Sequence, residues 1–174
     1  MIDKGTTTFE VAGSPKNESV EITASLAAGT STTLKTTGGL LANTCTASHA
    51  EGSTTSPYSG ATTVGGPLSS LSFSSCTEEK VVVDEAGSLT VEWTSGTNGT
   101  VRSAGAEVKV PSPFGKLTCK TGTGTGTDIG TLTGVKSGNA TMDINGVLNC
   151  GIIPSAVWEG SYTVTSPSGL GVSS

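Results

Sequence analysis

The chain has 174 residues and a formal net charge of −5, with 9 lysines and arginines against 14 acidic residues. Nucleic-acid-binding proteins gain most of their affinity by neutralising phosphates with basic side chains, so this composition argues against nucleic acid as a partner. It argues equally against an anionic membrane surface, and no apolar run approaches the roughly 20 residues of a membrane-spanning segment. Only 13% of the residues are charged and 25 are glycines, which favours strands joined by turns.

Strict alternation of apolar and polar residues recurs along the chain. A period of two places one set of side chains in a core and the other in water, which is typical of half-buried strands. The segment 18–28 could also form a helix, but its β-branched residues and clean alternation favour a strand. The predicted strands, in chain order, are Thr8–Ala12, Val20–Leu26, Thr33–Thr36, Leu71–Ser74, Lys80–Val83, Leu89–Trp93, Ala106–Val110, Lys116–Cys119, Ile129–Val135, Ala140–Ile144 and Tyr162–Val164.

Clusters of glycine, proline and asparagine separate these strands and predict turns. Asn145-Gly146 fits a tight type I′ hairpin, because both central residues of that turn need a positive φ. The polar segment Thr46–Ser56 predicts a loop, and the Gly-rich run Lys120–Asp128 predicts a hairpin loop. The other predicted turns are Gly13–Pro15, Gly38-Gly39, Gly65–Pro67, Gly96–Gly99, Pro111–Pro113 and Pro167–Gly169.

Many short strands at regular spacing predict a sandwich or a barrel. We expect an all-β fold, an antiparallel β-sandwich of the immunoglobulin-like or jelly-roll-like kind. The spacing from Cys45 to Cys76 equals that from Cys119 to Cys150, which indicates an internal duplication. The predicted β units are 1–86 and 87–174, either as two domains or as the halves of one continuous sandwich.

The cysteines favour disulfides over a metal site. There is no CxxC motif, and structural zinc sites place paired ligands two to four residues apart. We therefore expect neither a metal nor a cofactor. Four cysteines allow three pairings, and the repeat favours Cys45–Cys76 with Cys119–Cys150.

Disulfides form and persist in oxidising compartments. We therefore expect a secreted or extracellular protein at the cell surface. The chain opens with Met1–Gly5 and no apolar segment follows directly. We interpret this start as a mature form whose signal peptide has been removed.

No catalytic constellation is evident, so no catalytic residue is predicted. A Ser–His–Asp triad would have to use His49, the single histidine, but no GxSxG nucleophile motif accompanies it. Lys120–Asp128 lacks the ending of a phosphate-binding loop, and Asp128 has no dense set of acidic ligands for Ca²⁺. Paired carboxylates could hydrolyse glycosidic bonds, but most candidates occupy outward strand positions or turns. These candidates are Glu78, Glu79, Asp84, Glu85, Glu92, Glu107, Asp143 and Glu159.

Three aromatic side chains are candidates for stacking on a sugar ligand, because a planar ring offers an apolar face. Trp158 and Tyr58 lie near predicted turns. Trp93 is in register with Leu89 and Val91 and is expected to pack in the core. The competing interpretation for all three rings is structural packing.

The second half carries a series of strand and turn motifs, namely Phe114–Cys119 (FGKLTC), Ala140–Asn145 (ATMDIN) and Trp158–Pro167 (WEGSYTVTSP). In these motifs the chain resembles a group of uncharacterised exported β-rich proteins of soil actinobacteria. The resemblance spans most of the chain and implies an exported bacterial β protein. It carries over no functional residue, because no activity is assigned to the group.

We therefore expect an exported, non-enzymatic structural or interaction protein that is associated with the cell surface or self-assembles. Unpaired strand edges are templates for pairing between chains, and Lys4–Ala12 could add to a neighbour's sheet. The expected partner is another copy of the chain or a surface polysaccharide. Two alternatives stay open: a carbohydrate-binding β-sandwich module and a secreted hydrolase.

Overall fold

The computed structural model describes residues 6–36, 42–54, 61–77, 81–112, 115–124, 126–151 and 153–174. Within these segments every regular element is a strand, which confirms the predicted all-β fold. No described segment forms a helix of the length and apolarity needed to cross a membrane. The strands are β1 (Thr8–Val11), β2 (Ser14–Pro15), β3 (Glu21–Leu26), β4 (Thr32–Thr36), β5 (Ala42–Ser53), β6 (Val64–Cys76), β7 (Val82–Glu85), β8 (Ser88–Ser95), β9 (Asn98–Ala104), β10 (Glu107–Ser112), β11 (Gly115–Lys120), β12 (Thr127–Thr133), β13 (Thr141–Cys150), β14 (Ile153–Ser166) and β15 (Leu170–Ser173).

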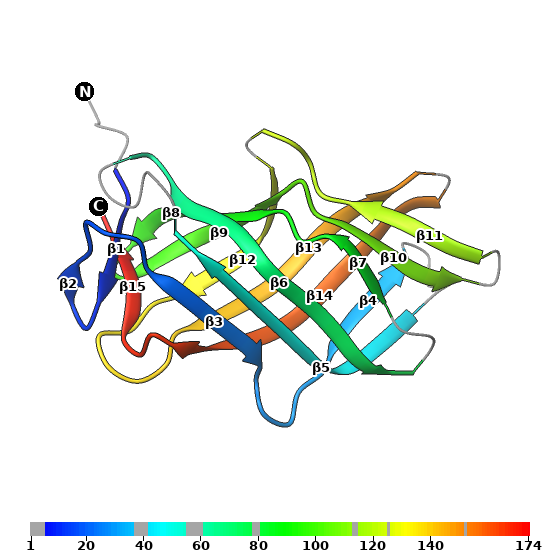
Figure 1. Cartoon of the computed structure of the whole chain (residues 1–174), viewed down its shortest axis with the longest axis horizontal. Coiled ribbons are helices and arrows are strands. Elements are labelled where there is room, and N and C mark those ends of the chain that lie inside the picture. Colours follow the sequence, from blue (N-terminus) through cyan, green and yellow to red (C-terminus); the bar gives the residue numbers. More distant parts are fainter. Residues whose placement is uncertain are drawn as a thin grey trace.

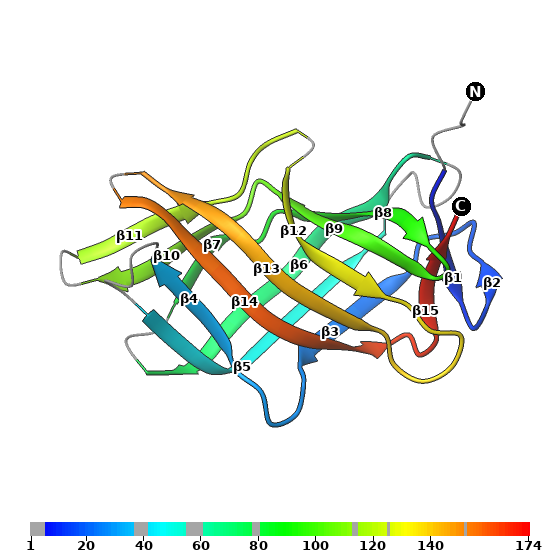
Figure 2. The same cartoon turned by 180° about the vertical axis from the view of Figure 1, so that it is seen from behind.

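Eight of the strands form one closed antiparallel ring (Figures 1 and 2). In ring order they are β3, β5, β6, β8, β9, β12, β13 and β14, and β14 pairs again with β3. This order follows the chain, so the ring is an up-and-down barrel. The fold is therefore not clearly the predicted sandwich, because these eight strands close into a barrel.

Four long strands, β5, β6, β13 and β14, continue beyond this ring toward the other end of the molecule (Figure 1). There β4 lies between β5 and β14, and a separate sheet of β7, β10 and β11 covers another side. We call the β7–β10–β11 sheet the side sheet. Among the described residues, one register pair, Lys120↔Asn149, joins it to β13.

At the opposite end, β1 lies between β15 and β2 in a small sheet (Figure 1). The register pair Thr8↔Ser173 places the first and last strands of the chain side by side. From this sheet Phe9, Leu170 and Val172 are buried in the core of the ring.

Two hydrophobic cores fill the two halves of the molecule. The first core lies inside the ring and includes Ile129 and Leu132, and the second lies beneath the side sheet and includes Phe73 and Val110. Trp158 packs against both. The cavities left between these side chains measure only about 40 and 60 Å³, so the interior is closely filled.

Both predicted disulfides are confirmed, and both belong to the second core. Cys45–Cys76 joins β5 to β6 at a directly opposed register pair. Cys119–Cys150 joins β11 of the side sheet to β13. The two disulfides therefore fasten different kinds of neighbour, one within the barrel wall and one between the side sheet and the barrel.

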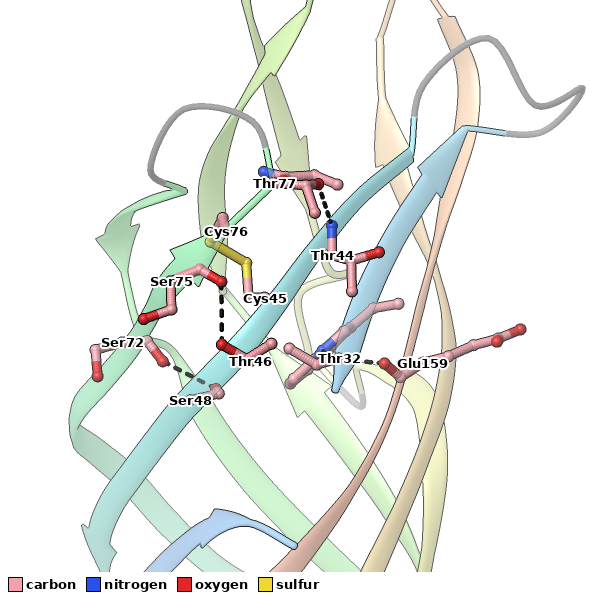
Figure 3. The surroundings of a disulfide bond; sticks show 12 residues. Thr32, Thr44, Cys45, Thr46, Ser48, Ser72, Ser75, Cys76, Thr77 and Glu159 are labelled. Atoms are coloured by element: carbon pink, nitrogen blue, oxygen red, sulfur yellow. Dashed lines mark hydrogen bonds between the residues drawn. A yellow bond between two sulfur atoms is a disulfide. The ribbon is translucent and has the colours of Figure 1, made fainter. Parts of the chain in front are cut away.

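Hydroxyl groups brace the strands around Cys45–Cys76, as Figure 3 shows. The backbone N–H of Thr44 donates to Thr77 Oγ1 at 3.1 Å, and Thr46 Oγ1 donates to the carbonyl of Ser75 at 3.3 Å. These bonds run between β5 and β6 and the residue that follows β6. This disulfide thus lies in a strand pair that is held together along its length.

Two of the predicted turns and much of the predicted Thr46–Ser56 loop are strands instead. Asn145-Gly146 lies inside β13, where a Cβ on Gly146 would come within 2.7 Å of Ile129. This glycine therefore allows the close approach of β12 and does not make a turn. Gly65–Pro67 lies inside β6, where a Cβ on Gly65 would collide with the backbone of β8. Residues 46–53 of the predicted loop belong to β5.

The boundary between the predicted units 1–86 and 87–174 falls between β7 and β8. Strands from the two segments pair with each other, for example β3 with β14 and β6 with β8. The two segments thus contribute to one barrel wall. Their origin by duplication stays a prediction.

Candidate functional site

An open groove of about 1070 Å³ lies on the outer surface between β11 and β13. Buried Leu148 and half-buried Leu117 line its lower part, while Lys116, Lys120 and Val147 are exposed. Of the described large apolar side chains, Val147 alone is exposed, at 54%. We refer to this feature as the β11–β13 groove.

The groove exists because β11 and β13 diverge on either side of a single contact point. They meet at Lys120↔Asn149 and at the adjacent disulfide Cys119–Cys150. The other edge of β11 is paired with β10 along its whole length, and the other edge of β13 is paired with β14. One edge of each strand therefore faces the groove.

The backbone of Thr118 in β11 points toward this groove. In an antiparallel ladder, residues bonded to the partner strand alternate with residues whose N–H and C=O point away from it. The hydrogen bond from Thr121 N to Ala106 O fixes this alternation between β10 and β11. Thr118 lies three residues before Thr121, so it occupies a position whose N–H and C=O point away from β10 and into the groove.

The backbone of Val147 in β13 points toward the same groove. Here the hydrogen bond from Val164 N to Ala140 O fixes the alternation between β13 and β14. Val147 lies seven residues after Ala140, so it occupies a position whose N–H and C=O point away from β14. β11 and β13 thus each direct backbone donors and acceptors into the groove, at points on opposite sides of the Lys120↔Asn149 pair.

The charged side chains along the groove are mostly basic. Lys120 Nζ lies 3.5 Å from Glu107 Oε1, with the lysine side chain 61% exposed, so solvent weakens this ion pair. Lys116 has no ion-pair partner among the described residues. Two lysines against one glutamate leave the groove with a net positive charge.

A shallower hollow of about 440 Å³ flanks the other side of β13 and is lined by Lys35, Asp143 and Glu159 among others. Ser161 Oγ donates to Asp143 Oδ1 at 2.8 Å. Asp143 and Glu159 are two of the candidates for a carboxylate pair, and the registers Asp143↔Ser161 and Asn145↔Glu159 place them diagonally, two rungs apart, on one face of the sheet. The hollow offers hydroxyl, amide and carboxylate groups to a polar ligand.

His49 lies in β5 on the barrel wall and not in the predicted loop. Its Nδ1 is 3.0 Å from Ser25 Oγ, and its Nε2 is 2.9 Å from Glu51 Oε1. In a serine hydrolase triad the nitrogens have the opposite roles, with Nε2 toward the serine and Nδ1 toward the carboxylate. His49 and Glu51 are 40% and 50% exposed, and neither residue lines the groove or the hollow.

The two described sugar-stacking candidates, Trp158 and Trp93, each pack against the protein interior. The Trp158 ring contacts Phe73 and Tyr162 edge-on, with centroids 5.7 and 6.1 Å apart, and its Nε1 donates to Thr32 Oγ1. Trp93 packs against the first core and its Nε1 donates to the carbonyl of Gly96. Tyr58 lies outside the described residues, so its role in stacking stays a prediction.

Within the described part of the chain, no three His, Cys, Asp or Glu side chains gather in a way that could hold a metal ion. No protein-family model matches the chain, and no curated protein and no solved structure matches it.

Sequence reasoning does not find the β11–β13 groove. Thr118 and Val147 alternate like any outward strand residues, and their proximity depends on how β11 meets β13. One signal was available in the sequence: Val147 is an apolar residue at an outward position between Asn145 and Asn149.

Proposed function

We propose that the protein is an exported, non-enzymatic interaction protein that binds its partner along the β11–β13 groove. The observation that carries this proposal is that β11 and β13 each leave backbone groups unpaired along one large open groove, on opposite sides of their Lys120↔Asn149 contact. Strand edges of this kind are ready templates for pairing with another chain. The two disulfides are consistent with export to an oxidising compartment.

The N-terminal segment Lys4–Ala12 is a weaker candidate for contact with a neighbour. Its strand Thr8–Val11 is paired with β15 on one edge and with β2 on the other. Self-association through this segment would require it to leave its own sheet. The groove needs no such displacement, which makes it the favoured binding surface.

Carbohydrate binding is the second candidate, favoured by the hollow at Lys35, Asp143 and Glu159. Polar groups on a strand face can hydrogen-bond to sugar hydroxyls. A secreted hydrolase would use either the chain Ser25–His49–Glu51 or the carboxylates Asp143 and Glu159 in the hollow. An esterase activity that is lost in Ser25→Ala would favour that reading.

The proposal is tested with two probes, namely other copies of the oxidised chain and washed cell walls of a Gram-positive bacterium. Light scattering and negative-stain imaging detect self-assembly, and sedimentation detects retention on the walls. We expect at least one probe to bind. We expect the double variant Lys116→Glu, Val147→Asp to lower that binding about tenfold or more, because it reverses the charge and removes the exposed apolar side chain.

The matched control is Lys136→Glu, Thr133→Asp, which makes the same change of charge at exposed positions outside the groove. It should bind as the unmodified chain does. A monomer of about 17.2 kDa that is not retained on the walls would overturn the proposed function. Equal loss of binding in both double variants would show that the β11–β13 groove is not the binding surface.

A further inference from the structure

We propose that the occupant of the β11–β13 groove is an extended strand of a partner polypeptide, which adds to the free edge of β11. This inference rests on the proposed function and names the chemistry of the partner. Strand addition needs a row of unpaired backbone donors and acceptors, and it takes its specificity from the side chains on either side of the added strand.

The first requirement is met at Thr118. Opposite Lys109 it occupies a position whose N–H and C=O are not used by the β10–β11 ladder. No described strand residue pairs with Thr118 on the groove side. Val147 of β13 lies on the far side of the Lys120↔Asn149 pair, so a strand added at Thr118 meets its backbone partners on β11.

The second requirement is met by the graded polarity of the groove. Side chains of an added strand alternate between its two faces. One face would contact Leu117 and Leu148 in the lower part of the groove, and the other would lie beside exposed Lys116 and Lys120. The groove thus fits a strand that alternates apolar and polar residues.

The positive charge along the groove favours an added strand that carries an acidic side chain. Lys116 has no carboxylate partner among the described residues, and Lys120 forms an exposed ion pair with Glu107. An acidic side chain on the outer face of the added strand would complement these lysines, mainly by guiding association at low salt. A neutral or basic strand has no such partner here.

A polysaccharide fits this groove less well. Sugar-binding surfaces commonly present aromatic rings that pack on the apolar face of the sugar. No described aromatic side chain lines the β11–β13 groove. The features present, namely backbone edges and alternating polarity, are those that a polypeptide uses.

The test uses a defined probe, a seven-residue synthetic peptide that alternates valine and threonine and carries one central glutamate. Binding to the ¹⁵N-labelled protein is followed by NMR up to millimolar peptide. We expect a chemical-shift change at the amide of Thr118. The same peptide with a methyl group on every backbone nitrogen keeps its side chains and has no N–H on either edge for strand pairing, so it should bind about tenfold or more weakly.

A protein variant repeats the test from the other side. Thr118→Pro removes the N–H that faces the groove and leaves the β10–β11 ladder intact, because that N–H is not used there. It should weaken peptide binding by about tenfold or more. The control is Ser72→Pro in β6, whose N–H likewise points away from its ladder partner β5 and lies outside the groove; it should bind the peptide normally.

The outcomes separate this inference from the proposed function. Equal binding of the methylated and unmethylated peptides, or no shift at Thr118, would overturn strand addition. Undiminished retention on cell walls stripped of protein by protease would identify a carbohydrate partner, which would also overturn it while leaving the proposed function standing. The methylated peptide keeps the test valid if Thr118→Pro does not fold.

Discussion

Tyr162 shows how a polar group is accommodated where the two cores meet. Burial raises the pKa of its hydroxyl above the ordinary value of 10.0, and hydrogen bonds, the largest from Ser48, oppose that rise. The hydroxyl donates to Ser48 Oγ at 2.7 Å, and Ser48 Oγ donates to the carbonyl of Ser72 at 2.9 Å. The buried polar atoms form a short satisfied chain, so their burial carries little penalty.

This raised pKa makes stability depend on alkaline pH. The folded state keeps the Tyr162 proton at a pH where the unfolded chain loses it, so this contribution is fully present below about pH 10 and is lost as the pH rises through the folded-state pKa. Tyr162→Phe should flatten this dependence and cost about 1 kcal/mol at neutral pH through the lost hydrogen bond. Urea unfolding at neutral and at alkaline pH measures both; an unchanged alkaline slope in the variant would contradict the assignment.

Gly146 is a second residue whose role is set by its neighbour. A Cβ there would lie 2.7 Å from Ile129 Cγ2 and 2.9 Å from Ile129 Cα, so backbone would have to move. We expect Gly146→Ala to destabilise the protein by about 1–3 kcal/mol. Gly122→Ala, where the nearest atom is 3.4 Å away, is the control in the same urea titration and should change stability much less.

At the scale of the elements, the two disulfides close loops of equal length in very different surroundings. Cys45–Cys76 lies in the β5–β6 pair, which continues in register from Ala47↔Ser74 onward. Cys119–Cys150 stands beside the one described register pair between the side sheet and β13. The loop-entropy contribution is therefore the same for both, about 3–4 kcal/mol, but only the second disulfide fastens a lightly bonded junction.

Removing each disulfide should separate the global effect from the local one. Both double variants, to alanine at Cys45 and Cys76 or at Cys119 and Cys150, should lose similar global stability, since the sequence separation is 31 in each. Only the second should speed amide hydrogen exchange in β10 and β11, by about tenfold or more, through local opening. Equal exchange in the two variants would show that core packing alone holds the side sheet.

The elements also show how far the sequence could predict the structure. Period-two alternation located most strands, and the cysteine repeat identified both disulfides. The alternation could not separate a barrel from a sandwich, because both folds place alternate side chains of each strand in a core. Asn145-Gly146 was misread because a glycine needed for the approach of Ile129 looks the same in sequence as one needed for a turn.

The groove was beyond sequence reasoning for a related reason. Whether the backbone N–H and C=O of Thr118 are hydrogen-bonded depends on the registers of β10, β11 and β13, which no local sequence pattern reports. Likewise, the contact between Ser25 and His49 depends on the register of β3 against β5. Where the surface sites lie on this fold depends on which strands pair and in which register. The core positions, in contrast, follow from the residue types along each strand.

At the scale of the whole molecule, the four long strands and Trp158 tie the two cores together. β5, β6, β13 and β14 contribute to both halves, and the Trp158 ring packs against both cores. Neither core can lose its strands without disturbing the other. The two halves are therefore expected to unfold together.

Calorimetry tests this coupling. We expect a single transition whose calorimetric and van't Hoff enthalpies agree. Trp158→Ala should cost about 3–5 kcal/mol, and Trp93→Ala, which touches only the first core, should cost less. Two resolved transitions in the unmodified chain would show instead that the halves fold independently.

The pairing of β1 with β15 has a practical consequence for handling this protein. Because Thr8 lies opposite Ser173, the chain enters and leaves the fold at one end, while β11 lies at the other end (Figure 1). A tag, a fluorophore or a solid support attached at either terminus would hold the molecule by the same pole. Whichever terminus is immobilised, β11 would lie at the end of the molecule away from the support.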